Sequence, residues 1–252
     1  MESIRKPFQG IKNIIRFNWH FYVVALLFLI LGLVLNLFLT TVFQLIINLI
    51  LFLIGISVLF SLLFSWYIYD YSGLYEYRWM GGFENTNKIL NIHAGFDETS
   101  EIIQQKFQNA ELTIFDFYDE QKHTEISIKR ARKFFPGSEK TIQVPTNQFP
   151  VENETFDLIF NIFSAHEIRN KEERIQFFNE QNRVLKPNGK IIIMEHLRDF
   201  PNFLAYTIGF FHFHSKNTWK KTFEETGFQI EKEIKKTAFI STFILTKNGI
   251  SS

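Results

Sequence analysis

The chain has 252 residues, a formal net charge of +1 and no cysteine. Acidic and basic residues are interspersed without a basic stripe, so we expect no nucleic-acid partner. The lack of cysteine is typical of a reducing compartment.

The first part of the chain is strongly apolar. No Asp, Glu, Lys or Arg occurs in residues 17–69. Because one helical membrane crossing takes about 20 apolar residues, this segment predicts two transmembrane helices, at about 19–39 and 42–67, with a turn at Thr40 and Thr41. A secretory signal would have a shorter apolar core and a small-residue cleavage site, which are absent here. A buried hairpin in a soluble domain is the remaining alternative.

The residues that flank this hairpin predict its orientation. Four basic residues precede the first crossing: Arg5, Lys6, Lys12 and Arg16. Basic flanks stay in the cytoplasm, and two crossings return the chain there. We therefore expect a basic cytoplasmic N-terminus over residues 1–18, a hairpin over 19–69, and a multi-pass protein of the cell (inner) membrane whose catalytic domain is cytoplasmic.

A segment rich in Tyr and Trp, SWYIYDYSGLYEYRWM at residues 65–80, leaves the hairpin. Such residues are typical of a membrane interface, although a helix that covers a ligand site would also suit them. Gly81 and Gly82 then interrupt the chain. We expect an interfacial linker over residues 70–86 and a single domain over residues 87–252.

Strands and helices alternate through this domain. Short apolar segments predict strands at 88–93, 112–117, 140–145, 156–163 and 190–197, and helical patterns occupy 98–109, 123–135, 171–185 and 218–227. Such alternation predicts parallel strands with helices on both faces. Two final strands, 228–236 and 238–247, are joined by a connection so short that they must be antiparallel. The predicted fold is α/β and Rossmann-like: a mostly parallel seven-stranded sheet with one antiparallel strand at its end, preceded by the transmembrane hairpin.

The most specific sequence pattern lies in residues 149–197. Phe149-Pro150 is followed by Phe156-Asp157, an apolar strand, a helix that ends in RVLKPNG, and another apolar strand. This order of motifs resembles the class I S-adenosylmethionine-dependent methyltransferases, of the type 11 or type 25 kind, and the similarity covers about residues 87–247. The resemblance implies methyl transfer with S-adenosylmethionine as the cofactor.

The resemblance also implies a cofactor loop after the first strand. The family has an acidic residue and three alternating glycines there; this chain has Asn91, His93, Gly95 and Asp97, so the motif is degenerate. Gly95 still permits positive φ and close approach of the backbone. Asn91 has no charge for the cofactor's amino group, a role that Asp97 or Glu98 could take. We interpret the loop as modified but functional; the alternative is an ordinary helix N-cap without a ligand.

Further cofactor contacts are implied after the second and third strands. Asp116 matches the family's acid that holds the ribose hydroxyls, with Asp119 as the fallback. Thr146 and Asn147 stand where the family often has an Asp near the adenine, so they are the candidates for that contact.

Candidate catalytic residues follow the fourth and fifth strands, because ligands of open α/β sheets bind beyond the carboxyl ends of the strands. These ends read SAHEIR and EHLRD. We predict His166 as a general base, since histidine titrates near neutral pH, and Glu195 as its neighbour in the site. The alternative for His166 is a structural histidine that only caps a loop. For His196, too, a place in the active site and a structural role both remain open.

Residues 200–219 are rich in aromatic side chains and interrupted by Gly and Pro. In the family an insertion at this point often shapes the acceptor pocket, which implies an apolar acceptor. Rings that cover the sheet or lie on the bilayer are an equal alternative. His212 and His214 have the spacing of a metal-binding pair on a strand, but no partner motif accompanies them, so we expect no metal site.

Two functions remain open from the sequence. The first is a methyltransferase at the cytoplasmic membrane surface that acts on a lipid, a quinone or a lipid-like natural product. Its partners would be the lipid bilayer and an apolar small-molecule acceptor. The second is a non-catalytic scaffold or binding subunit that keeps the methyltransferase fold.

Overall fold

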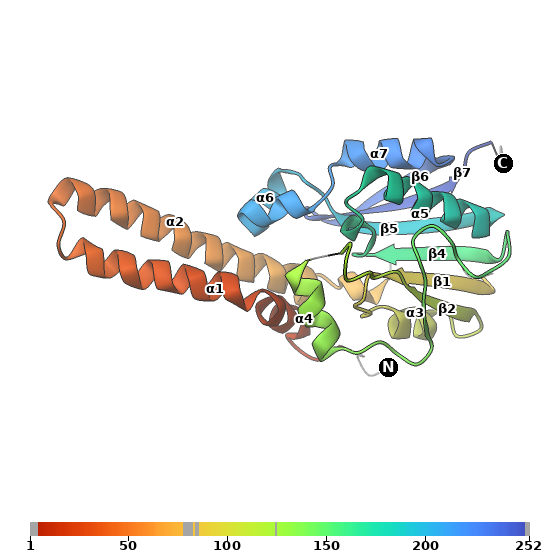
Figure 1. The fold of residues 1–252 in the computed structure, drawn as a ribbon, viewed down its shortest axis with the longest axis horizontal. Helices are drawn as coiled ribbons and strands as arrows, with labels where there is room; N and C mark the ends of the chain where they lie inside the picture. Colours follow the sequence, from red (N-terminus) through yellow and green to blue (C-terminus); the bar gives the residue numbers. More distant parts are fainter. Residues whose placement is uncertain (1–4, 78–82, 84–85, 124, 250–252) are drawn as a thin grey trace.

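The computed structural model describes residues 5–77, 83, 86–123 and 125–249. A two-helix hairpin projects from one end of an α/β domain (Figure 1). The hairpin consists of α1 (Gln9–Asn36) and α2 (Thr41–Trp66). Helix α1 begins well before the predicted crossing at residue 19, and its backbone is irregular at Asn18, where the side-chain amide donates to the carbonyl oxygen of Ile14. The predicted break at Gly81 and Gly82 lies outside the described residues.

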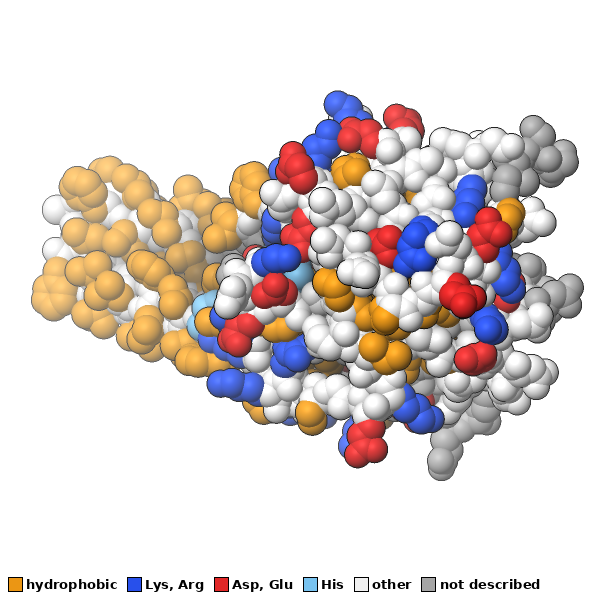
Figure 2. Space-filling model, turned by 45° about the vertical axis from the view of Figure 1, so that its right-hand side comes forward, with side chains coloured by type: hydrophobic (Ala, Val, Ile, Leu, Met, Phe, Trp, Pro, Cys, Tyr) orange, Lys and Arg blue, Asp and Glu red, His pale blue; other side chains and the backbone are white. Residues whose placement is uncertain are grey.

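The hairpin exposes its apolar side chains. In the described part of the chain, two helical stretches, Gln9–Asn36 and Thr41–Glu76, are long and apolar enough to cross a membrane, and their most apolar windows are not buried within the protein. Figure 2 shows apolar side chains over the projecting hairpin and charged side chains over the domain. A soluble core hairpin would bury these side chains, so the packing within this chain does not support the soluble alternative.

Among the described residues, seven strands form one sheet in the order β3-β2-β1-β4-β5-β7-β6. Their bounds are β1 Lys88–His93, β2 Glu111–Asp116, β3 Thr141–Gln143, β4 Phe156–Ile162, β5 Leu185–His196, β6 Phe228–Thr237 and β7 Ile240–Lys247. Strands β1 to β5 run parallel, and β7 is antiparallel to both β5 and β6. The predicted Rossmann-like, mostly parallel sheet is confirmed, but the position of the antiparallel strand at the end of the sheet was wrong: β7 lies between β5 and β6, and β6 forms the edge.

The domain helices are α3 (Ser100–Lys106), α4 (Ile126–Phe134), α5 (Lys171–Val184), α6 (Phe200–Tyr206) and α7 (Lys216–Glu225). Two of them begin at side-chain caps: Asn170 accepts from the backbone N–H of Glu173, and Ser215 accepts from that of Thr218. Such caps satisfy otherwise unpaired N–H groups of the first turn. A third capped helix is α6, which the sequence pattern did not predict: the side chain of Asp199 accepts from the backbone N–H of Asn202, and the helix spans seven residues from Phe200.

Two apolar clusters hold the sheet between its helices. On one face α5 and α7 contribute Phe177, Phe178, Trp219 and Phe223. The other face is covered by α3, α6 and the segment that leaves the hairpin, through Ile103, Ala205, Ile68, Leu74 and Tyr77. Full burial of a large apolar side chain stabilises a fold by about 1.5–3 kcal/mol. The end of the hairpin is therefore part of the domain core.

Candidate functional site

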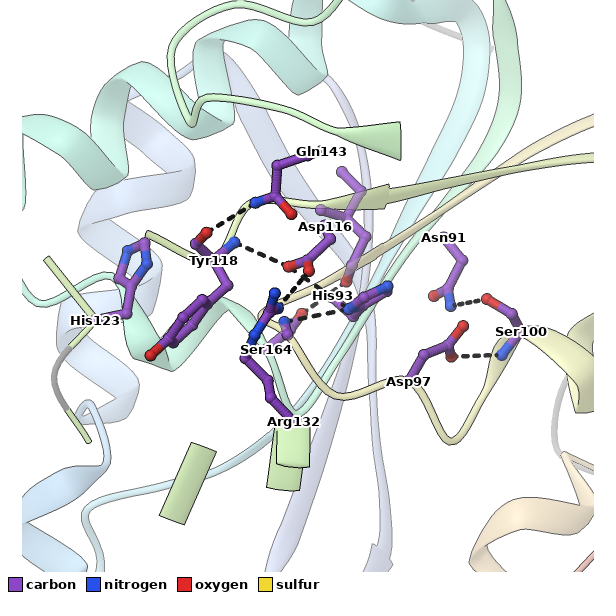
Figure 3. A network of polar contacts seen from close by, with 12 residues as sticks. Asn91, His93, Asp97, Ser100, Asp116, Tyr118, His123, Arg132, Gln143 and Ser164 are labelled. Atoms are coloured by element: carbon purple, nitrogen blue, oxygen red, sulfur yellow. Dashed lines mark hydrogen bonds and ion pairs between the residues drawn. The ribbon is translucent and has the colours of Figure 1, made fainter. Parts of the chain in front are cut away.

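The loop between β1 and α3 lies where the sequence predicts a cofactor loop, at the carboxyl end of β1 (Figure 3). Asn91 is buried, and its amide nitrogen donates to the hydroxyls of Thr99 at 2.9 Å and Ser100 at 2.8 Å. Its Oδ1 atom is buried without a hydrogen-bond partner. Asn91 thus ties the strand to the start of α3 and keeps one free acceptor.

Gly95 has the backbone conformation that its motif position requires. Its φ is +84°, which favours glycine. A Cβ atom there would lie 2.8 Å from Nη1 of Arg132 and 3.1 Å from Cβ of Tyr118. The backbone N–H of Gly95 donates to Nδ1 of His93 at 3.2 Å, while Nε2 of His93 is buried without a partner. Burial lowers the pKa of His93, so this ring is neutral at pH 7.

The two carboxylates next to Gly95 have structural contacts. Asp97 accepts from the backbone N–H groups of Thr99 and Ser100, both at 2.9 Å, and so caps the first turn of α3. Glu98 turns toward the hairpin: it accepts from Asn13 at 2.8 Å and pairs with Arg5 at 3.3 Å. In this state neither side chain is free to replace the missing charge at Asn91.

Asp116 ends β2 and is buried beside this loop. One oxygen accepts from the backbone N–H of Tyr118 at 2.9 Å, and the other accepts from Nη1 of Arg132 at 2.6 Å. The guanidinium of Arg132 also lies over the ring of Tyr118. Asp116 is therefore at the strand end where the sequence places it, with one oxygen held by Arg132 (Figure 3), and its role in binding ribose stays a prediction.

Arg132 belongs to α4, which stands against the hairpin rather than on the sheet (Figure 1). Nη1 of Arg130 donates to the carbonyl oxygen of Phe17 at 2.7 Å. The ring of Phe17 meets those of Phe96, next to Gly95, and Phe135, at the end of α4. Through these contacts the hairpin, α4 and the cofactor loop form one packed unit.

The two candidates for the adenine contact line a cavity of about 490 Å³. Thr146 is buried and donates to Glu173 at 2.8 Å, whereas Asn147 is exposed. The cavity extends past His123 to Glu167 and Arg169, beyond the carboxyl ends of β3 and β4. Neither Asp116 nor the loop between β1 and α3 is among the residues that line it.

His166 and Glu195 converge beyond the ends of β4 and β5. Nδ1 of His166 lies 2.6 Å from Oε2 of Glu195, and its Nε2 lies 3.4 Å from Oε1 of Glu167. Burial lowers the pKa of His166, but the carboxylates of Glu195 and Glu167 outweigh burial and raise this pKa to about 10. His166 is thus protonated at pH 7 in this arrangement, and its role as a general base stays a prediction.

The aromatic segment after β5 brings a second histidine to this cluster. Nε2 of His212 lies 3.4 Å from Oε1 of Glu167, and its Nδ1 lies 3.0 Å from Oε1 of Glu125. Arg169 also contacts Nδ1 of His212. The sequence did not indicate this grouping, because His212 lies far from His166 in the chain. His214 points elsewhere, toward Arg174 and the carbonyl oxygen of Ile168.

His196 connects the hairpin to the sheet. Its Nε2 lies 2.7 Å from the hydroxyl of Tyr69, and its Nδ1 lies 2.9 Å from Oδ1 of Asn202 and 3.2 Å from the carbonyl oxygen of Phe239. The ring stacks between Phe163 and Phe213. Burial lowers the pKa of His196 to about 4, so the ring is neutral and structural.

Residues 90–193 match the family described as a methyltransferase domain. The matched residues span β2, β3, β4 and most of β1 and β5, the part of the sheet that carries the candidate cofactor residues. The chain is 28% identical over 137 residues to the demethylmenaquinone methyltransferase of Thermotoga maritima, an alignment that covers 54% of this chain and 53% of that protein. This methyltransferase-like chain therefore spans about half the length of the curated relative that it matches.

Solved structures share the fold at low identity. A protein from Pyrococcus horikoshii OT3 superposes with a TM-score of 0.50 at 18% identity, over 69% of this chain and 86% of that one. Human N-acetylserotonin methyltransferase in complex with SAM gives a TM-score of 0.50 at 14% identity, over 77% and 55% of the two chains. At these identities the likeness shows the fold alone.

The residues at the carboxyl ends of β1 and β2 fit S-adenosylmethionine with one change. Among the described residues, Asn91 and His93 each keep a buried polar atom without a partner. At Gly95 a Cβ would clash with Arg132, and Asp116 is a buried carboxylate that could accept from two hydroxyls. The required change is that Arg132 leaves Asp116, because its guanidinium lies against both Gly95 and that carboxylate.

Proposed function

We propose that this protein is a membrane-anchored methyltransferase that transfers a methyl group from S-adenosylmethionine to an apolar small molecule at the cytoplasmic surface of the cell (inner) membrane. The hairpin would cross the bilayer twice, with both of its ends on the cytoplasmic side. Basic residues before the first crossing support this orientation. The acceptor would be a lipid, a quinone or a lipid-like natural product.

One observation carries the proposal: the apolar hairpin joins the domain at the edge of the sheet that bears the site. Tyr69 reaches His196 next to Glu195, and Phe17 packs on Phe96 next to Gly95. Ligands of open α/β sheets bind at this edge. An acceptor dissolved in the bilayer would therefore need only a short path along the base of the hairpin.

The segment after β5 supports an apolar acceptor. Phe200, Ile208 and Phe211 are each at least 60% exposed, and α6 packs against α2 at the base of the hairpin. Exposed apolar patches of this kind mark membrane or ligand contacts. The relative from Thermotoga maritima is named for demethylmenaquinone, which supports a quinone among the possible acceptors.

The chain's own residues would bind and orient the two reactants. Bound S-adenosylmethionine supplies an activated methyl group on a sulfonium. Asp116 would accept from the ribose hydroxyls, the backbone at Gly95 would approach the amino-acid part, and Thr146 and Asn147 would line the adenine cavity. His166, held by Glu195, would face the acceptor. Holding two reactants in line lowers the activation barrier by several kcal/mol. This alignment is therefore the main catalytic contribution that we assign to the protein.

Arg132 at Asp116 favours the second function, a non-catalytic scaffold with a closed cofactor site. A scaffold of this kind would not bind S-adenosylmethionine, whereas the enzyme must. Calorimetric titration of the detergent-solubilised full chain with S-adenosylmethionine distinguishes the two functions. The enzyme is supported if the parent chain binds S-adenosylmethionine and the Asp116→Asn variant does not.

The acceptor can be sought by mass spectrometry of membrane lipids from cells that lack this protein. We expect a species lighter by one methyl group to accumulate in those cells. Adding back the full chain should convert that species, and adding back the Asp116→Asn variant should not. Identical lipid profiles in all three strains would contradict an apolar membrane acceptor. The hairpin is kept in these tests because Ile68 at its end is part of the domain core.

A further inference from the structure

The candidate base His166 meets two side chains without an assigned role, Glu167 and His212, beyond β4 and β5. His166, Glu167 and His212 offer ligand atoms that all lie within 4.8 Å of one another. Two of the residues follow β4, and the third comes from the aromatic segment after β5. Two imidazoles and one carboxylate are a ligand set that zinc and similar divalent metals use in catalytic sites.

Each histidine is oriented by a carboxylate behind it. Nδ1 of His166 lies 2.6 Å from Glu195, which is fully buried, and Nδ1 of His212 lies 3.0 Å from Glu125. A carboxylate that accepts from Nδ1–H leaves the lone pair on Nε2, and metal-bound histidines in proteins almost always have such a partner. Arg169 can then pair with the same Glu125 carboxylate, from which it lies 3.7 Å.

The distances suit one ion between the three side chains. Both Nε2 atoms lie 3.4 Å from the same oxygen, Oε1 of Glu167. Two ligands bound at about 2.0–2.1 Å with a tetrahedral angle between them lie about 3.4 Å apart. Small movements would bring all three atoms to bonding distance of a common centre.

Among the described residues, one carboxylate oxygen of Glu167 has no partner, while the other faces both histidines. Its side chain is 3% exposed, and its Oε2 atom is buried without a hydrogen-bond partner. Glu195 on the other side of His166 is fully buried as well. Buried charge requires compensation. In the metal-free state the protonated His166 supplies it, and a divalent ion would balance both carboxylates once His166 has lost its proton.

We propose that His166, Glu167 and His212 bind one divalent transition-metal ion of the zinc type. The ion takes the place of the proton between Nε2 of His166 and Glu167, and that proton leaves to solvent. Glu167 lines the cavity beyond β3 and β4, so an open coordination position is accessible to a ligand oxygen. This site goes beyond the proposed methyl transfer and does not depend on it.

The test measures metal binding by the full chain, purified in detergent and treated with a chelator. Titration with Zn²⁺ should give one tight site per chain. Titration with Co²⁺ should give the visible absorption of an ion with four or five nitrogen and oxygen ligands. Glu167→Gln and His212→Gln should each weaken binding at least tenfold. Glu195→Gln, behind His166, should weaken it by about 10–100-fold, as outer-shell partners typically do.

His20→Gln is the matched control, because His20 lies in α1 and contacts Arg130 instead. It should bind metal as the parent does. Substitution of His212, which is partly exposed, should leave the melting temperature close to that of the parent, so weaker binding there reports ligation. The proposal is overturned if the parent binds no ion, or if Glu167→Gln and His212→Gln bind as tightly as the parent and the control.

Discussion

Asp116 and Arg132 are the residues on which access to the cofactor site depends. Both Asp116 oxygens already accept hydrogen bonds, one from the Tyr118 backbone and one from the Arg132 guanidinium. Only the second bond comes from a side chain that can rotate away. We therefore expect cofactor binding to require that Arg132, whose side chain is 38% exposed, leaves Asp116 for another partner.

We expect Asp116→Asn to weaken S-adenosylmethionine binding by tenfold or more, because a hydrogen bond to a charged group contributes about 1.5–3 kcal/mol. Arg132→Gln should strengthen binding, since it removes the competing guanidinium. Calorimetry on the solubilised chain measures both variants. Asp119→Asn is the control, since Asp119 accepts from Gln121 on the surface. Weakening in the control alone would move the ribose site to Asp119.

Substitution of Gly95 should destabilise the protein more than substitution of a glycine that has open space around it. Gly95→Ala meets a positive φ and a clash with Arg132, so we expect a loss of about 1 kcal/mol or more in the free energy of unfolding. Gly137→Ala is the matched control, since no atom lies within 4 Å of its new Cβ. Thermal unfolding of both variants checks this; equal melting temperatures would contradict the strained loop.

At this scale the sequence predicted the positions of the candidate residues but not their partners. Asp116, Gly95 and His166 lie at the strand ends where the motif order places them. Their contacts with Arg132 and His212 could not be predicted, because each joins segments separated by other elements. No local sequence pattern predicts that α4 packs against the hairpin or that the aromatic segment after β5 contacts Glu167.

At the element scale, the buried strands were the most predictable feature. β1 spans the predicted residues 88–93, because a short apolar run between polar segments is buried on both faces. β5 starts earlier than predicted, at Leu185, since Pro and Gly suggested a turn after α5. Helix α6 was missed because its seven residues are too few to show a helical period.

His196 of β5 contacts Tyr69 at the end of the hairpin, Asn202 in α6 and the Phe239 carbonyl before β7, and its protonation should weaken these contacts. The folded ring has a pKa of about 4, lowered by burial and by the positive influence of His166 and His212, against about 6.5 in the unfolded chain. Between these pH values the unfolded state binds more protons, so stability falls as pH falls below 6.5. The loss should reach about 3 kcal/mol near pH 4.

The measurement is the free energy of unfolding of the solubilised chain between pH 4 and pH 7. In His196→Asn the part of the slope due to this ring should disappear, although stability at pH 7 will also be lower. The groups that face the ring, Tyr69, Asn202 and the Phe239 carbonyl, do not titrate in this range. An unchanged slope in His196→Asn would assign the acid sensitivity to another group.

On the scale of the whole molecule, the hairpin and the domain form one packed structure. Ile68 and Leu74 lie in the same apolar cluster as strand residues of the sheet. Glu98 binds Asn13 in α1 and Tyr75 after α2. The predicted linker over residues 70–86 therefore packs on the domain in its described part, and it joins the hairpin firmly to the domain.

The orientation of this assembly can be measured with reporter fusions. We expect a reporter inserted at Thr41, between α1 and α2, to be outside the cytoplasm, and a reporter after residue 252 to be inside it. The reason is the basic segment before the first crossing together with two crossings. Reporters on the same side of the membrane would contradict a two-pass hairpin.

The central claim is that the domain transfers a methyl group from S-adenosylmethionine to a membrane acceptor. Its most direct test incubates the full chain in native membranes with S-adenosylmethionine labelled in the methyl group, followed by extraction into organic solvent. We predict label in the lipid-soluble fraction with the parent and only background label with Asp116→Asn. Background label with the parent, together with no S-adenosylmethionine binding by calorimetry, would contradict the account.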